Sequence, residues 1–99
     1  MPEYPLSVFK TLDPELLKLV ENTSEFTFAD GVLPRKTKLL IAMALDAAHG
    51  AVGGVRALAQ EAMDAGATKE EIAETLRVSN YVSGVGSVYT AAHALRELP

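Results

Sequence analysis

The stretch that decides the fold is LPRKTKLLIAMALDAAHG, residues 33–50. Pro34 stands near its start, where the fixed φ of proline suits the first turn of a helix. Apolar residues then recur at spacings of one, three and four, which places them on one face of a helix. The pattern predicts an amphipathic helix from Pro34 to about His49. Its apolar face consists of Leu39, Leu40, Met43, Ala44 and Ala47.

The residues after this stretch predict further helices. An interruption at Gly50, Gly53 and Gly54 is followed by a second apolar stripe that ends at Gly66, a glycine well placed to adopt the left-handed cap conformation. Thr68-Lys-Glu-Glu71 has the pattern of a capping box, in which the Thr side chain and the Glu carboxylate each accept a hydrogen bond from the backbone at the helix start.

The last segment, residues 81–98, is rich in small and aliphatic residues and is interrupted only by Gly84 and Gly86. The spacing of its valines and alanines is helical. We expect a tightly packed helix that either continues the one preceding it or is kinked from it.

On the amino-terminal side, Asp13-Pro14-Glu15 combines a capping side chain, a proline at the first helical position and an acid in the first turn. It predicts a short helix through about Asn22, followed by a connector over residues 23–33. Residues 1–12 contain two prolines and no clear period, so we expect an extended arm. No pair of strands is indicated, and the chain is predicted to be all-α.

Composition limits the class of protein. The chain has 99 residues, of which 48% are hydrophobic, and this predicts one domain over residues 1–99 that completes its burial by forming a homo-oligomer. A formal net charge of −4 argues against nucleic-acid and anionic-membrane partners. Without a signal sequence or a long apolar run, we expect a cytoplasmic protein. The absence of cysteine excludes disulfides and Cys-ligated metal sites.

Residues 33–50, followed by AGATKEEIAETL at 65–76, resemble the carboxymuconolactone decarboxylase and AhpD-like (alkylhydroperoxidase D) family. The resemblance covers about residues 26–95. It implies an all-α helical bundle whose helix pairs pack into a homo-oligomer, either a trimer or a hexamer. It also implies either peroxidase or decarboxylase chemistry, depending on which residues occupy the site positions.

In the AhpD-like peroxidases a Cys-x-x-Cys pair begins a helix, and a nearby Glu and His relay protons to it. The helix start lowers the pKa of the first thiol. The resemblance places Ala51 and Gly54 at the two cysteine positions. Gly53 occupies the position before the second cysteine. Leu58 occupies the position of the His, and Leu39 that of the Glu. Every element of the relay is missing, so we expect no dithiol peroxidase activity.

The decarboxylase branch of the family lacks the cysteine pair and places His, Glu and Arg in the same helix; here only Arg56 matches that pattern. His49 and His93 are the remaining catalytic candidates. His49 is expected at a helix end, where an imidazolium interacts favourably with the backbone carbonyls, and His93 is expected on a surface or an interface. The two histidines lack helical spacing, which argues against a metal site, and no cofactor is expected.

Two further features are candidates for binding. Ser79, Asn80 and Tyr81 lie mid-helix beside glycines, where they could line a ligand pocket or pack across an interface. The Gly53-Gly54 pair indicates close helix packing or a loosened first turn rather than an anion site, because no Lys or Ser follows as in a P-loop.

Two classes of function remain open. The first is a family member that has lost the dithiol site and acts as a non-redox homo-oligomeric protein, either structural or binding a small molecule. The second is a lyase or decarboxylase for a small carboxylated or lactone substrate, with Arg56 holding the carboxylate and His49 or His93 handling protons. Convergence of these three residues in one pocket would favour the enzyme.

Overall fold

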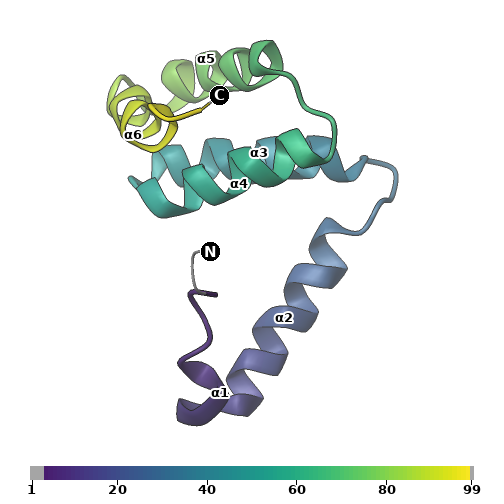
Figure 1. Cartoon of the computed structure of the whole chain (residues 1–99). Helices are drawn as coiled ribbons and strands as arrows, with labels where there is room; N and C mark the ends of the chain where they lie inside the picture. Colours follow the sequence, from purple (N-terminus) through teal and green to yellow (C-terminus); the bar gives the residue numbers. More distant parts are fainter. Residues whose placement is uncertain (1–3, 99) are drawn as a thin grey trace.

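Two antiparallel helices form the centre of the structure, a computed structural model that describes residues 4–98. The described residues contain six helices and no strand: α1 (Phe9–Leu12), α2 (Pro14–Phe28), α3 (Arg35–Ala48), α4 (Val52–Asp64), α5 (Lys69–Ser83) and α6 (Gly86–Leu95). Helices α5 and α6 cover one side of the α3–α4 pair, and α1 and α2 project from the other side (Figure 1). The prediction of an all-α fold is confirmed.

The core lies where α3, α4, α5 and α6 meet. Its largest fully buried side chains are Leu39 and Met43 on α3 and Val55 on α4. Most other buried positions hold alanine, whose small side chain lets helices approach closely while the interior stays densely packed. These alanines are Ala47, Ala59, Ala62, Ala67, Ala91 and Ala94.

The ends of α3 and α4 are fixed by the same backbone turn. Gly50 and Gly66 adopt φ values of 78° and 103°, which side chains disfavour. In each turn the N–H after the glycine reaches back to a carbonyl of the last helical turn, as in a Schellman motif. The two hydrogen bonds are Ala51 N to Asp46 O and Ala67 N to Ala62 O, both 2.9 Å. The helix ends predicted at about His49 and Gly66 are confirmed.

The predicted capping box at the start of α5 is also confirmed. The Glu71 backbone N–H donates to Thr68 Oγ1 at 3.1 Å, and the Thr68 N–H donates to Glu71 Oε1 at 2.8 Å. Lys36 Nζ lies 2.9 Å from Glu71 Oε2 and joins the start of α3 to the start of α5. The Thr68 N–H, and then Lys36, stabilise the ionised carboxylate and lower the pKa of Glu71.

The amino-terminal predictions were wrong in their boundaries. Helix α2 continues to Phe28 instead of ending near Asn22, so that half of the predicted connector is helical. Thr23 Oγ1 bonds the Leu19 carbonyl within the helix, and Phe28 packs against the core around Leu39. This tertiary contact stabilises the additional helical residues of α2, which the local sequence does not predict.

The predicted extended arm over residues 1–12 is folded from residue 5 onwards, while its first three residues lie outside the described part. Residues 5–8 form turns and α1 follows, so the segment doubles back on α2. Tyr4 donates a 2.8 Å hydrogen bond from its hydroxyl to Glu21. That bond raises the pKa of the Tyr4 hydroxyl.

Of the two alternatives for the carboxyl-terminal segment, a break between two helices is observed. Helix α5 ends at Ser83 and is followed by Gly84, whose φ of 86° interrupts the helical path, and α6 begins at Gly86. Residues 81–83 of the predicted last segment therefore belong to α5. Within residues 4–98, no helix is long and apolar enough to cross a membrane.

We expect Glu71→Gln to lower the free energy of unfolding at neutral pH. Because the pKa of Glu71 is lowered on folding, its contribution is present above the unfolded value near 4.5 and is lost as the pH falls through the lower folded value. Urea unfolding at pH 7 to 3 should therefore show the wild-type advantage shrinking as the pH falls. Glu74→Gln, which removes an exposed carboxylate of the same helix, is the control. An advantage independent of pH would contradict this account.

Candidate functional site

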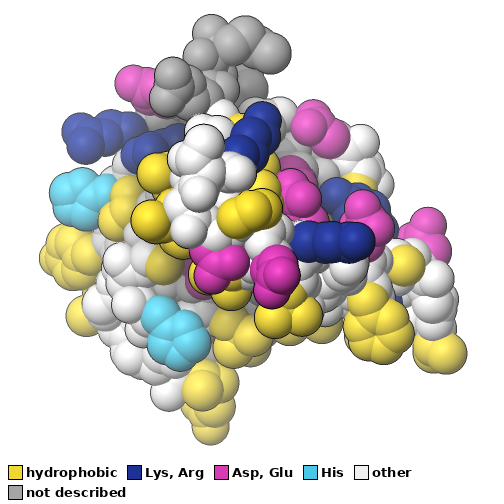
Figure 2. Space-filling model, turned by 90° about the horizontal axis from the view of Figure 1, so that it is seen from below, with side chains coloured by type: hydrophobic (Ala, Val, Ile, Leu, Met, Phe, Trp, Pro, Cys, Tyr) yellow, Lys and Arg dark blue, Asp and Glu magenta, His cyan; other side chains and the backbone are white. Residues whose placement is uncertain are grey.

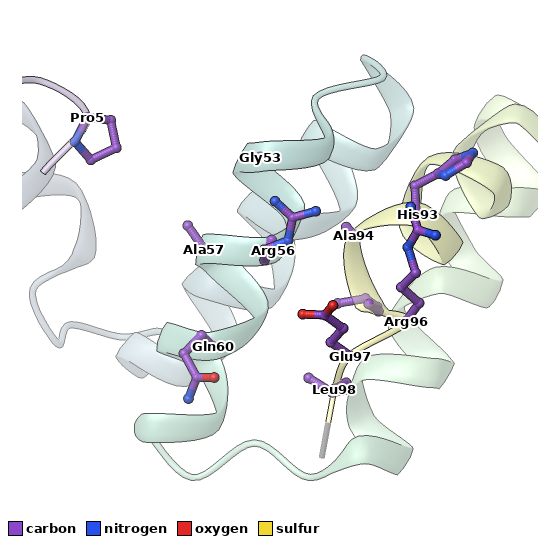
Figure 3. Close-up of a pocket in the computed structure, with 11 residues that line it drawn as sticks. Pro5, Gly53, Arg56, Ala57, Gln60, His93, Ala94, Arg96, Glu97 and Leu98 are labelled. Atoms are coloured by element: carbon purple, nitrogen blue, oxygen red, sulfur yellow. The ribbon is translucent and has the colours of Figure 1, made fainter. Parts of the chain in front are cut away.

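A groove lies between α4 and the end of α6. Its volume is about 830 Å³, within the usual range for small-molecule sites. One side is formed by a face of α4 and the other by the last turn of α6 and the residues after it (Figure 3). The lining residues are Pro5, Gly53, Arg56, Ala57, Gln60, His93, Ala94, Leu95, Arg96, Glu97 and Leu98.

Polar groups of both signs reach this groove. Arg56 and Gln60 are exposed on α4, one helical turn apart, and so project from one face. His93 and Arg96 are three residues apart at the end of α6, and the Glu97 carboxylate is directed towards α4 (Figure 3). Two guanidinium groups against one carboxylate give the groove a net positive charge.

The three catalytic candidates predicted from sequence do not all converge. Arg56 and His93 line the same groove, whereas His49 is not part of its lining. His49 is exposed and occupies the capping position after α3. The two histidines of the chain appear as separate surface side chains (Figure 2). The structure therefore places Arg56 and His93 in the same groove and His49 outside it.

The candidate ligand residues on α5 lie elsewhere. Ser79 is buried, and its hydroxyl has no hydrogen-bond partner among the described residues. Asn80 and Tyr81 are exposed, the latter at 90%. None of the three lines the α4–α6 groove or the smaller hollow beside α6.

The positions that the sequence resemblance assigns to a peroxidase relay contain small and apolar residues. Ala51 is the residue before α4, and Gly53 and Gly54 lie in its first turn. Leu39 is fully buried in a cluster with Ala62 and Ala67, and Leu58 packs against it. A carboxylate at position 39 would be buried without a partner in the observed packing, at high energetic cost.

Gly54 makes room for the Asp46 side chain of α3 against the first turn of α4. A Cβ at this position would lie 2.8 Å from Asp46 Cγ and would overlap Asp46 Oδ2. The half-buried Asp46 carboxylate therefore rests against the first turn of α4, where the helix dipole favours a negative charge. The sequence indicated either close helix packing or a loosened first turn at Gly53-Gly54. Close packing is observed at Gly54, whereas a Cβ at Gly53 would meet nothing within 4 Å.

Sequence reasoning missed Asp46, Arg96 and Glu97. No local sequence pattern marks Asp46, and only the fold brings it over Gly54. Arg96 could have been found, because it follows His93 by three residues and so shares its helix face. Within residues 4–98, no group of three or more His, Cys, Asp or Glu side chains is arranged to hold a metal ion.

Comparison with known proteins agrees with the fold. Residues 14–97 match the model of the carboxymuconolactone decarboxylase family, and the chain belongs to this family. A carboxymuconolactone decarboxylase family protein from Legionella pneumophila, whose crystal structure is of the apo form, is 37% identical, with a TM-score of 0.86. The match covers 92% of this chain and 81% of that one. A search of curated proteins found no significant match.

The contact between Gly54 and Asp46 predicts opposite effects for two neighbouring substitutions. Gly53→Ala should raise the free energy of unfolding by up to about 1 kcal/mol, since alanine favours a helix and has open space here. Gly54→Ala should lower it by about 1 kcal/mol, because displacing the half-buried Asp46 carboxylate costs more than the same gain in helix propensity. Chemical denaturation measures both, and Asp46→Ala should remove most of the penalty at position 54. Equal stabilisation by the two alanines would show that the close contact is unimportant.

Proposed function

We propose that the protein is a non-redox member of its family that binds a small carboxylated molecule and acts as a homo-oligomer. The observation that carries the proposal is the α4–α6 groove of about 830 Å³ with Arg56 and Arg96 in its lining. Guanidinium groups recognise carboxylates by paired charge-assisted hydrogen bonds. A ligand of this class would neutralise the excess positive charge of the groove.

The rest of the groove fits a compact organic acid. Ala57, Ala94 and Leu98 contribute apolar surface for a carbon skeleton. Gln60 and Glu97 supply a donor and acceptors that could select hydroxyl or lactone oxygens of the ligand. This mixture of apolar walls and few polar groups is typical of small-molecule sites.

The non-redox part of the proposal is supported by the replacement of the relay. No thiol is present in the chain, and two relay positions, Leu39 and Leu58, contribute to the hydrophobic core. Restoring the chemistry would require changes in the core as well as two cysteines. The homo-oligomeric part is supported by the many large apolar side chains that remain exposed in one copy, among them Leu19, Phe26 and Tyr89.

Replacing either groove arginine should weaken carboxylate binding. Calorimetry with benzoate, succinate and a carboxylated butenolide should detect at least one ligand for the wild type. Arg56→Ala and Arg96→Ala should each reduce its affinity by about 10- to 100-fold, because a hydrogen bond to a charged group contributes about 1.5–3 kcal/mol. Lys69→Ala, which removes a positive charge outside the groove, should have little effect. Binding that is unchanged in both arginine variants would refute this site.

A decarboxylating lyase is the second candidate, and the presence of Arg56 and His93 in one groove favours it. Arg56 would hold the substrate carboxylate. The bond from this carboxylate to the adjacent carbon would break, CO₂ would leave with the carboxylate carbon, and His93 would protonate the carbon left behind.

This second candidate predicts CO₂ release from a carboxylated butenolide by the wild-type protein. His93→Gln should lower turnover by about 10²- to 10⁴-fold, the usual contribution of a positioned acid, with little change in the dissociation constant. Isotopically labelled CO₂ gives the readout, and His49→Gln is the matched control outside the groove. Ligand binding without CO₂ release would leave the binding function and exclude the lyase for that substrate.

A further inference from the structure

Charged side chains of opposite sign line the α4–α6 groove without pairing with each other. With histidine neutral, the charged groups of the lining are the side chains of Arg56, Arg96 and Glu97. No ion pair within residues 4–98 includes any of these groups. All of them are exposed, so they are hydrated when the groove is empty. A ligand that carries both signs of charge can therefore bind them without first breaking an ion pair of the protein.

The Gln60 side chain adds a hydrogen-bond acceptor to the groove. Its Nε2 donates to Asp64 Oδ1 at 3.1 Å, one helical turn further along α4. Because an ionised carboxylate only accepts hydrogen bonds, this contact fixes the amide nitrogen on the Asp64 side. The amide oxygen of Gln60 then points towards the wall formed by the end of α6 (Figure 3). It is available to a donor group of a ligand.

The groove changes sign along α4. Arg56 lies one turn nearer than Gln60 to the start of the helix. Of the two carboxylates on α4, Glu61 forms an ion pair outside the groove lining, and Asp64 bonds to Gln60 from behind. From the opposite wall, the Glu97 carboxylate is directed towards α4 (Figure 3). The Arg56 end of this wall therefore favours an anion, and the Gln60 end favours a cation.

Helix geometry sets the distance between the two ends. Arg56 and Gln60 are four residues apart, and a rise of 1.5 Å per residue separates the starts of their side chains by about 6 Å along α4. An ammonium and a carboxylate joined by three methylenes are about 5 Å apart, since each C–C bond is about 1.5 Å long. Ala57 and Ala94 line the groove and offer apolar surface to these methylenes. A short linear amino acid thus has the length to reach both ends.

We propose that the groove selects an amino carboxylate, whose carboxylate binds Arg56 and whose ammonium group binds Glu97 and the Gln60 oxygen. An acid without an amine would leave Glu97 without a counter-charge and would place a second negative charge near it. The amine removes this repulsion and adds charge-assisted hydrogen bonds. The inference rests on the carboxylate binding of the proposed function and names a second group that the same site recognises.

Three probes of similar size separate the contributions of the two charged groups. They are 4-aminobutyrate, butyrate, which lacks the ammonium group, and butylamine, which lacks the carboxylate. Amide NMR titration of the 10.5 kDa chain measures dissociation constants even for weak ligands. We expect 4-aminobutyrate to bind about 5- to 10-fold more tightly than either other probe, because pairing inside a groove exceeds pairing in open solvent. The shifts should concentrate in residues 53–60 and 93–98.

The variant Glu97→Gln tests the ammonium contact. It should weaken 4-aminobutyrate to about the affinity of butyrate, while butyrate itself binds as before or slightly more tightly because a like charge has gone. A side chain that only shaped the groove would affect both probes alike. Glu74→Gln removes an exposed carboxylate of α5 outside the groove lining and is the matched control. The same NMR spectra show whether each variant keeps the fold.

The outcomes separate this inference from the proposed function. If 4-aminobutyrate binds no better than butyrate, or keeps its advantage in Glu97→Gln, the ammonium site is overturned. Butyrate or succinate binding that depends on Arg56 would still support the carboxylate site in that case. Butylamine binding as tightly as 4-aminobutyrate, with no effect of Arg56→Ala on either, would overturn the carboxylate site and the inference together.

Discussion

The close antiparallel packing of α3 against α4 is the constraint on which the rest of the structure depends. Leu39, Met43 and Val55 are fully buried there, and Gly54 admits the Asp46 carboxylate against the first turn of α4. Dense interiors tolerate little change in volume, so this contact fixes the direction in which α4 leaves the turn. The groove wall that carries Arg56 is positioned by the same contact.

The same packing fills the positions that the resemblance assigns to a thiol site with small and apolar side chains. At the start of α4, where a reactive pair would stand, a capping alanine and a glycine fit the turn and the neighbouring helix. Leu39 and Leu58 complete the apolar layer that a proton relay would have interrupted with charged groups.

The groove and the exposed apolar side chains of α2 lie in different parts of the molecule. Arg56 approaches the groove from α4, and His93 and Arg96 approach it from α6. Helix α2 leaves from the other side of the bundle, and Pro5 before it lies at the groove lining. Arg96 borders both the groove and the hollow beside α6.

The sequence alone determined the features that depend on neighbours in the chain. The stripe in residues 33–50, the left-handed glycine after α4 and the Thr68 capping box are local patterns, and each predicted its element correctly. The family, and with it the loss of the dithiol site, could also be predicted from residues at fixed spacing. Of the candidate site, the sequence supplied Arg56 and His93 but could not show that they share a groove.

Tertiary structure decided the features that depend on contacts between distant segments. Phe28 extends α2 because it meets the core around Leu39, and Asp46 faces Gly54 because α3 folds back on α4. The groove exists because the end of α6 lies beside α4, which no local pattern encodes. Hydrogen bonds within a turn are specified by a few consecutive residues, whereas burial and groove geometry result from the simultaneous packing of all the helices.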